Sequence, residues 1–349
     1  MGGGTLPKKI FITDCEGPLS VNDNAFELAG HFIPDGEKFF SEVSHYDDVM
    51  VEEVKRPGYN AGDTLKLIIP FLKAYGVDNQ KIIDFSRENV MMVPGATETM
   101  AYVESTMPSF IVSTSYGQYI NALCDLTGFS FENTYFTQAD LDKHALLPTE
   151  KQRLMEIKDL IVNGADFETM DKIFFEELPQ MEIGKILCDV KTVGGGGKKL
   201  AVEDIIKKND ASTDSVMYVG DSITDVEPLK FAKENHGVSV SFNGNEYAIN
   251  AADIAIISKN TMATSILIDL HSKFNSDYVK RFVEGYVIDP QRALANFRVS
   301  FQLLEQFKEI FGSDLPIIEL INDENREELI KKSLICRKEL RGESIGGLG

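Results

Sequence analysis

The chain has 349 residues, of which 43% are hydrophobic, and its 55 acidic and 35 basic side chains give a formal net charge of -20. This length favours two compact units or one core with large insertions, and the hydrophobic content is enough for a buried core. Such an acidic surface repels a phosphate backbone, which argues against nucleic acid or an anionic membrane surface as a partner.

Features that indicate secretion or membrane insertion are missing from the sequence. The four cysteines are widely scattered without a CxxC pair, as in a reduced protein. Residues 1–5 lack the apolar stretch of a signal peptide, and no run of eighteen uncharged apolar residues occurs. We therefore expect a cytoplasmic protein without membrane insertion.

The first predicted element is a buried strand at Ile10-Phe11-Ile12, which delivers Asp14 and then Glu16 to a loop that begins with Gly17-Pro18. In a parallel α/β sheet, ligands bind outside the carboxyl ends of the strands. A solvated turn with two acids explains this stretch equally well when it is taken alone.

Residues 21–92 have helical periodicity and no strand of their own. The predicted helices, separated by a turn-rich break at 55–62, cover 24–31, 36–54, 64–75 and 79–88. The sequence therefore predicts a helical cap inserted after the first strand.

Strands and helices alternate in the rest of the core. Predicted strands at 109–113, 133–137, 215–219, 238–242 and 254–257 are separated by helices and by a charged helical insertion at about 140–192. This alternation indicates a Rossmann-like parallel sheet in an α/β fold. We expect a core of residues 1–20 plus 93–275, a cap of residues 21–92, and extra helices in residues 276–349.

Several predicted strand ends and one helix start carry polar side chains that suit phosphoryl transfer. These residues are Asp14, Glu16, Ser113, Lys198, Asp221 and Asp225. Clustered carboxylates repel one another, and Mg²⁺, which prefers oxygen ligands, relieves that repulsion. A lysine and a serine hydroxyl would then stabilise a phosphoryl group while one carboxylate attacks phosphorus.

This order of elements resembles the haloacid dehalogenase (HAD) superfamily of aspartate-nucleophile phosphotransferases. The matching motifs are Asp14-Cys15-Glu16-Gly17, Ser113, Lys198 and Gly220-Asp221-Ser222-Ile223-Thr224-Asp225. The resemblance covers roughly Lys8–Leu19, Val93–Thr137 and Val193–Ser258. The whole chain, with its Tyr46-Asp47-Asp48 and Leu340-Arg341-Gly342 segments, also resembles a small archaeal branch labelled in part as energy-converting hydrogenase A subunit R.

The resemblance implies a role for each motif residue. Asp14 would be the nucleophile, and Glu16 the general acid that then activates water. Asp14, the Glu16 carbonyl and Asp221 would hold Mg²⁺, with Asp225 in support. Ser113 would position the phosphoryl group.

Lys198 would neutralise and orient Asp14, and Lys199 is the alternative lysine. Glu16 departs from the pattern, because most phosphatases of this superfamily have Asp there. The extra methylene moves the carboxylate by about 1.5 Å, and misplacement on that scale costs about 100-fold in rate.

The substrate expected from this resemblance is a small phosphorylated metabolite, enclosed by the cap. Candidate substrate-binding residues are Thr114, Arg56, Tyr59 and Asn243, with Asn60 and Lys66 beside the turn-rich break, although helix faces and loop packing explain the cap residues equally well. A homo-oligomer or a larger protein complex is left open. The alternative function is a binding or accessory protein on a HAD scaffold, with weak chemistry.

Other catalytic motifs fit poorly. The run Gly194–Lys199 lacks the Gly and the Ser or Thr of a P-loop, since Thr192 and Lys199 occupy those positions. The five histidines have no HxxH or HExxH spacing, so a zinc hydrolase is disfavoured. No GxSxG elbow is present.

Overall fold

A computed structural model describes residues 8–348, so residues 1–7 and Gly349 lie outside the description that follows. Seven strands form one sheet in the order β3-β2-β1-β4-β5-β6-β7. The strands are β1 (Ile10–Thr13), β2 (Ser109–Tyr116), β3 (Thr134–Thr137), β4 (Val216–Gly220), β5 (Val238–Phe242), β6 (Ile254–Ile257) and β7 (Ile317–Leu320). Strands β1 to β6 pair in parallel, as the sequence predicts, and β7 pairs antiparallel with β6.

Helices cover both faces of the sheet, because successive strand residues point to opposite sides. In β1, Phe11 packs into one hydrophobic cluster, while Ile10 and Ile12 pack into the other. The helices on the Phe11 face are α6 (Ala96–Thr106), α7 (Gly117–Thr127), α14 (Met262–Lys273), α15 (Ser276–Ile288), α16 (Pro290–Asn296) and α17 (Phe301–Phe311). Those on the opposite face are α11 (Gly196–Lys208), α12 (Val226–Glu234) and α13 (Glu246–Ala251).

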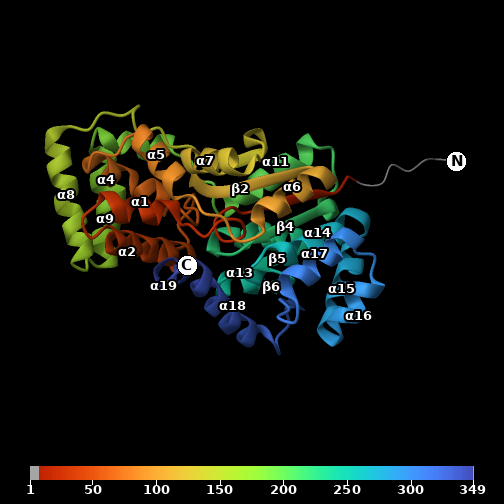
Figure 1. Cartoon of the computed structure of the whole chain (residues 1–349). Helices are drawn as coiled ribbons and strands as arrows, with labels where there is room; N and C mark the ends of the chain where they lie inside the picture. Colours follow the sequence, from red (N-terminus) through yellow and green to blue (C-terminus); the bar gives the residue numbers. More distant parts are fainter. Residues whose placement is uncertain (1–7, 349) are drawn as a thin grey trace.

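A group of helices beyond one end of the sheet encloses a separate hydrophobic cluster (Figure 1). Its first part is α1 (Asn24–Phe32), α2 (Gly36–Val49), the π-helical turn η1 (Met50–Val54), α3 (Thr64–Leu67), α4 (Ile69–Ala74) and α5 (Asn79–Asn89). Its second part is α8 (Pro148–Val162), α9 (Phe167–Lys172), η3 (Ile173–Glu177), η4 (Leu178–Gln180), η5 (Ile183–Lys185) and α10 (Ile186–Asp189). The predicted insertion at 140–192 thus shares one core with the predicted cap, a relation that the sequence did not indicate.

The helices of residues 21–92 join the sheet through two adjacent linkers. The Val21 N–H donates to the Met91 carbonyl at 3.0 Å, and the Val93 N–H donates to the Leu19 carbonyl at 2.8 Å. We call residues 20–22 and 90–93 the cap hinge. The domain boundaries drawn from the sequence stay a prediction.

The C-terminal part of the chain returns to the sheet and then to the cap. Residues 276–349 were expected to add helices alone, yet they also contribute β7 to the sheet edge. Helix α18 (Arg326–Arg341) then runs toward the cap, and α19 (Glu343–Gly346) ends beside α2 (Figure 1). No helix within residues 8–348 combines the length and apolar character that a bilayer-spanning segment needs.

Candidate active site

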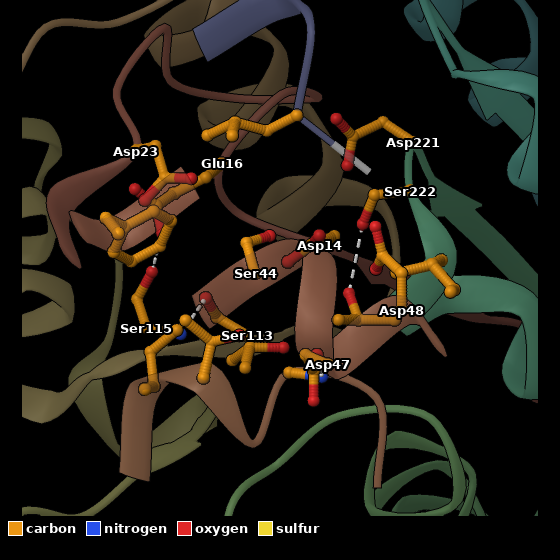
Figure 2. A pocket seen from close by; sticks show the side chains of 18 of the residues that line it. Asp14, Glu16, Asp23, Ser44, Asp47, Asp48, Ser113, Ser115, Asp221 and Ser222 are labelled. Carbon is orange, nitrogen blue, oxygen red and sulfur yellow. Dashed lines mark hydrogen bonds between the residues drawn. The ribbon is translucent and has the colours of Figure 1, made fainter. Parts of the chain in front are cut away.

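The predicted motif residues meet around one cavity at the carboxyl edge of the sheet. Asp14 directly follows β1, Ser113 lies in β2, and Asp221 directly follows β4. All three line the cavity, which has a volume of about 100 Å³. Figure 2 shows Asp14 between Asp221 on one side and Glu16 with Asp23 on the other.

Asp14 is held by a fully buried lysine. The Lys198 ammonium lies 2.9 Å from Asp14 Oδ2 and 2.8 Å from Asp225 Oδ1, and the Cys15 N–H donates to Asp14 Oδ1 at 2.7 Å. The alternative, Lys199, instead lies 5.9 Å from the Phe231 ring. The structure therefore places Lys198 in the position that the resemblance implies for the motif lysine.

Glycines before α11 allow the cap loop to approach the start of this helix closely. A Cβ on Gly194 would lie 1.9 Å from the Ala61 carbonyl oxygen, and Gly195 has a φ of +50°. Both positions therefore require glycine. These glycines therefore allow a cap loop to pack against the start of α11.

Both carboxylate oxygens of Asp225 accept hydrogen bonds from residues around the site. Its Oδ1 accepts from Lys198 and from the Tyr218 hydroxyl at 2.6 Å, and its Oδ2 accepts from the Asp221 and Ser222 N–H groups at 2.9 and 3.2 Å. Burial alone would raise the pKa of Asp225, but Lys198 and these donors hold it below its ordinary value. Asp225 is therefore an ionised anchor whose two oxygens already have partners.

The pKa of Asp14 is shifted in the opposite direction to that of Asp225. Burial and the negative charge of Asp225 raise the pKa of Asp14 well above its ordinary value, despite the nearby Lys198. The Asp14 and Asp225 carboxylates, for their part, raise the pKa of Lys198 in spite of its burial. An ionised Asp14 would thus be stabilised by further positive charge in the cavity.

Asp221 is contacted by two arginines that the sequence did not single out. Both lie on α18: Arg337 forms a short ion pair with Asp221 Oδ2, and Arg341 Nη1 lies 3.1 Å from the same oxygen. Asp221 Oδ1 is buried without a hydrogen-bond partner. The sequence signals were the spacing of the arginines, four residues apart, which places them on one helix face, and the Leu340-Arg341-Gly342 segment of the archaeal resemblance.

Glu16 is fixed on the cap side of the cavity. One carboxyl oxygen accepts from the Ser115 hydroxyl, and Oε2 accepts from the Asn24 N–H at 2.5 Å, at the start of α1. Burial, together with the charge of Asp23, raises the pKa of Glu16 well above its ordinary value. A carboxyl group in this environment retains its proton to higher pH than usual and can therefore donate it.

The cap closes the cavity with further acidic side chains that sequence reasoning missed. Asp47 and Asp48 on α2 line it, together with Ser44 and, from the start of α1, Asp23. Burial raises the pKa of Asp47 to about 8 and that of Asp48 to about 6. The Tyr46-Asp47-Asp48 segment was noted only as part of the archaeal resemblance and was given no role in the site.

Of the four predicted substrate-binding residues, only Thr114 lines the cavity, where its hydroxyl is buried without a partner. Arg56 pairs with Asp171 at 3.1 Å and stacks on Phe175 at 3.7 Å. The Tyr59 ring packs 6.3 Å from the Phe175 ring.

The remaining candidates have structural partners. The Asn243 side chain exchanges two hydrogen bonds with the Ser258 backbone, at 2.7 and 2.9 Å. Lys66 pairs with Asp63 at 3.3 Å, and Asn60 lies near Gly196. None of these three side chains lines the cavity.

The residues present fit a divalent cation. Carboxylate oxygens of Asp14, Asp221 and Asp225 lie within 4.8 Å of one another. The partnerless Asp221 Oδ1 is a buried oxygen of the kind that a hard cation binds. Because both oxygens of Asp225 have protein donors, Asp225 supports the site through Lys198 and the Asp221 backbone.

No known protein-family model and no curated protein matches the chain. Among solved structures, the gene product AF1437 from Archaeoglobus fulgidus is 30% identical, with a TM-score of 0.79, over 98% of this chain and 99% of that chain. The chain belongs to the same family as AF1437.

More distant matches are enzymes. A phosphoserine phosphatase in a phospho-aspartyl intermediate analogue is 16% identical over 73% of this chain and 96% of that chain, with a TM-score of 0.48. A HAD family hydrolase, T0658 from Salmonella enterica, is 11% identical over 71% of this chain and 67% of that chain, with a TM-score of 0.47. Such TM-scores are too low to support conclusions about chemistry.

The fold of this AF1437 relative is HAD-like. Asp14 follows β1, Ser113 lies on β2, Lys198 lies on α11 and Asp221 follows β4. All four meet at the carboxyl edge of the parallel sheet. This arrangement confirms the resemblance and the fold class predicted from the sequence. The hydrogenase-subunit label stays a prediction, since none of these matched structures carries it in its name.

Proposed function

We propose that the chain is a Mg²⁺-dependent phosphatase that acts on a small phosphorylated metabolite through an aspartyl-phosphate on Asp14. The single observation that carries this proposal is the contact of Lys198 with Asp14, 2.9 Å away, in a cavity that Ser113 and Asp221 also line. A nucleophilic carboxylate, a hydroxyl donor and a cation-binding carboxylate are the groups that phosphoryl transfer needs together.

In the first half-reaction, an Asp14 oxygen attacks phosphorus and the bond from phosphorus to the leaving oxygen breaks. Glu16 gives its proton to that leaving oxygen. In the second half-reaction, Glu16 takes a proton from water and the water oxygen attacks phosphorus. The bond from phosphorus to the Asp14 oxygen breaks, which releases phosphate and restores the Asp14 carboxylate. Ser113 donates a hydrogen bond to a phosphoryl oxygen, and Lys198 orients Asp14 and favours its ionised form.

Asp14, Asp221 and the Glu16 carbonyl would hold Mg²⁺. The bound ion would supply positive charge that offsets the phosphoryl oxygens and the clustered carboxylates. The cavity volume of about 100 Å³ is well below the roughly 300–1,000 Å³ of small-molecule binding sites. A metabolite larger than its phosphoryl group would therefore enter only after the cap moves.

A second candidate function is a HAD-scaffold binding or accessory protein with little turnover. The observation that favours it is the pairing of Asp221 with Arg337 and Arg341, which supplies positive charge beside a proposed Mg²⁺ ligand. Fold alone does not decide between the two functions.

Turnover of an aryl phosphate separates these functions. We expect release of the phenol by the wild-type chain with Mg²⁺, and a loss of at least about 1,000-fold in Asp14→Asn. The matched control is Asp214→Asn, an exposed aspartate just before β4, which should retain activity. If neither the wild type nor Glu16→Asp shows turnover with Mg²⁺, the phosphatase proposal fails and the binding function remains.

A further inference from the structure

Helix α18 brings the only arginines that line the cavity within residues 8–348, and both contact Asp221. The Arg337 and Arg341 side chains are 3% and 6% exposed, so neither is a mobile surface group. A buried guanidinium is costly unless it has a partner, and Asp221 is their shared anionic partner.

The acidic and basic side chains of this buried cluster are equal in number, even with Asp14 counted as ionised. Three carboxylates, those of Asp14, Asp221 and Asp225, lie within 4.8 Å of one another. Three cations contact them: Lys198 pairs with Asp14 and Asp225, and the two arginines pair with Asp221. A divalent cation placed beside Asp221 would therefore meet two positive charges at short range.

The same arginines connect the site to the cap hinge and to the end of the chain. Arg341 Nε donates to the Val21 carbonyl at 3.1 Å, and Nη2 donates to the Asn22 carbonyl at 2.6 Å. Arg337 Nε donates to the Gly346 carbonyl at 3.2 Å. Any change at Asp221 that shifts these guanidinium groups is thus transmitted to the hinge and to α19.

The C-terminal segment also packs on the cap itself. Ile345 and Leu348 pack against the hydrophobic cluster of the cap, and Leu348 lines the cavity. Ser333, four residues before Arg337, fixes α18 to the core by donating to the Gly244 carbonyl at 2.6 Å. Figure 1 shows α18 and α19 extending from the core side to α2 of the cap.

We propose that α18 and α19 form a latch in which Arg337 and Arg341 compete with a divalent cation for Asp221. The arginines neutralise Asp221 and hold the cap hinge while the cation is absent. Binding of the cation weakens their contact with Asp221 and loosens the segment 337–348 and residues 20–22. The latch rests on the proposed function in one respect, the role of Asp221 as a cation ligand.

The test measures binding of Mn²⁺ alone, by calorimetric titration of the full chain. In Arg341→Met, we expect Mn²⁺ to bind at least about tenfold more tightly than in the wild type, because a nearby like charge is removed. Arg341→Lys keeps the charge and should stay within about threefold of the wild type. Arg326→Met, which removes an arginine paired with Asp323 at the start of α18, is the matched control.

A second measurement uses the unaltered protein, in case Arg341→Met folds poorly. Hydrogen exchange of peptides that cover residues 20–22 and 337–348 should become faster when Mn²⁺ is bound. Unchanged or slower exchange, or unchanged or weaker Mn²⁺ binding in a folded Arg341→Met, overturns the latch. If Asp221→Asn abolishes Mn²⁺ binding but Arg341→Met leaves the affinity unchanged, the latch is overturned and the proposed cation site stands. An absence of Mn²⁺ binding removes the proposed cation site as well.

Discussion

At the scale of single residues, Glu16 decides how well the proposed chemistry works. Its side chain is one methylene longer than the aspartate that the resemblance implies at this position. Ser115 and the Asn24 N–H hold its two carboxyl oxygens, so the longer side chain has a defined position. Ser115 comes from β2 and Asn24 from the start of α1, and no sequence pattern indicated that either would meet Glu16.

The proton on Glu16 leads to a testable pH dependence. Because burial raises the pKa of Glu16, the protonated form persists to higher pH, and kcat falls as the pH rises through that value. Glu16→Gln cannot donate this proton, so we expect kcat to drop by about 100- to 10,000-fold and the alkaline fall to vanish. The measurement is kcat against pH, with Asp214→Asn as control. An unchanged profile in Glu16→Gln would exclude Glu16 as the acid.

A second residue prediction concerns folding stability and Asp47, which is 3% exposed. Burial raises its pKa from 3.8 to about 8, so the folded state holds a proton that the unfolded state releases between these values. The free energy of unfolding therefore falls progressively as pH rises from about 4 to 8, and this loss is constant above pH 8.

Asp47→Asn removes this cost. We expect the variant to gain on the order of a few kcal/mol over the wild type at pH 8 and little at pH 4, by urea unfolding at both values. Glu53→Gln, an exposed residue in η1, is the control. An equal difference between the Asp47→Asn variant and the wild type at both pH values would contradict the assignment.

At the scale of elements, the cap is built from two stretches of sequence that share one core. Phe174, in η3 of the insertion, is buried with its ring 5.4 Å from Tyr46 of α2 and 6.5 Å from Phe71 of α4. Its neighbour Phe175 is 38% exposed. The two adjacent phenylalanines therefore form a matched pair for testing whether the insertion stabilises the cap.

We expect Phe174→Ala to lower the free energy of unfolding by about 3–5 kcal/mol, because it leaves a cavity between the two parts of the cap. Phe175→Ala should cost about 1 kcal/mol or less. Chemical denaturation of the two variants checks this difference. Equal, small effects of the two substitutions would mean that packing of the insertion against α2 and α4 contributes little to the free energy of unfolding.

The strands were the most predictable elements. The predicted ranges 238–242 and 254–257 coincide with β5 and β6, because buried parallel strands are continuous apolar runs between loops. Strand β7 was missed, since Ile317–Leu320 is a four-residue edge strand with only Ile318 fully buried. Its pairing with β6 joins distant parts of the chain, which local periodicity does not reveal.

The candidate site also has a part that could be predicted from the sequence and a part that could not. Asp14, Ser113, Lys198 and Asp221 follow recognisable strand and helix boundaries, so their meeting could be predicted from the rule for parallel sheets. The contacts of Arg337 and Arg341 with Asp221 span 116 and 120 residues of sequence. On a charged helix such as α18, their spacing of four residues does not by itself distinguish these two arginines from solvated ones.

At the scale of the whole molecule, a net charge of -20 opposes the compact state. Salt screens this repulsion over about 10 Å at 0.1 M and about 3 Å at 1 M, so the folded protein should become more stable as salt is added. We expect the melting temperature to rise from low salt to about 1 M KCl, by roughly 1–2 °C for each kcal/mol gained in a chain of this length. Calorimetry at several KCl concentrations checks this, and a falling melting temperature would show that local ion pairs outweigh the overall repulsion.

The cavity also depends on the whole molecule, since core, cap and C-terminal segment all line it. Asp14 comes from the core, Asp47 from the cap, and Arg341 from the last long helix. Motion of the cap relative to the core would therefore change the surroundings of the proposed nucleophile, the acid and the cation ligand together.

The central claim is that Asp14 becomes phosphorylated, and trapping the intermediate tests it most directly. The full chain is incubated with an aryl phosphate and Mg²⁺ and quenched with borohydride, which reduces an acyl phosphate to an alcohol. Mass spectrometry should then find homoserine in place of Asp14, and only when the aryl phosphate is present. Turnover of the phosphate with Asp14 unmodified, or with the reduced residue elsewhere in the chain, would contradict the account.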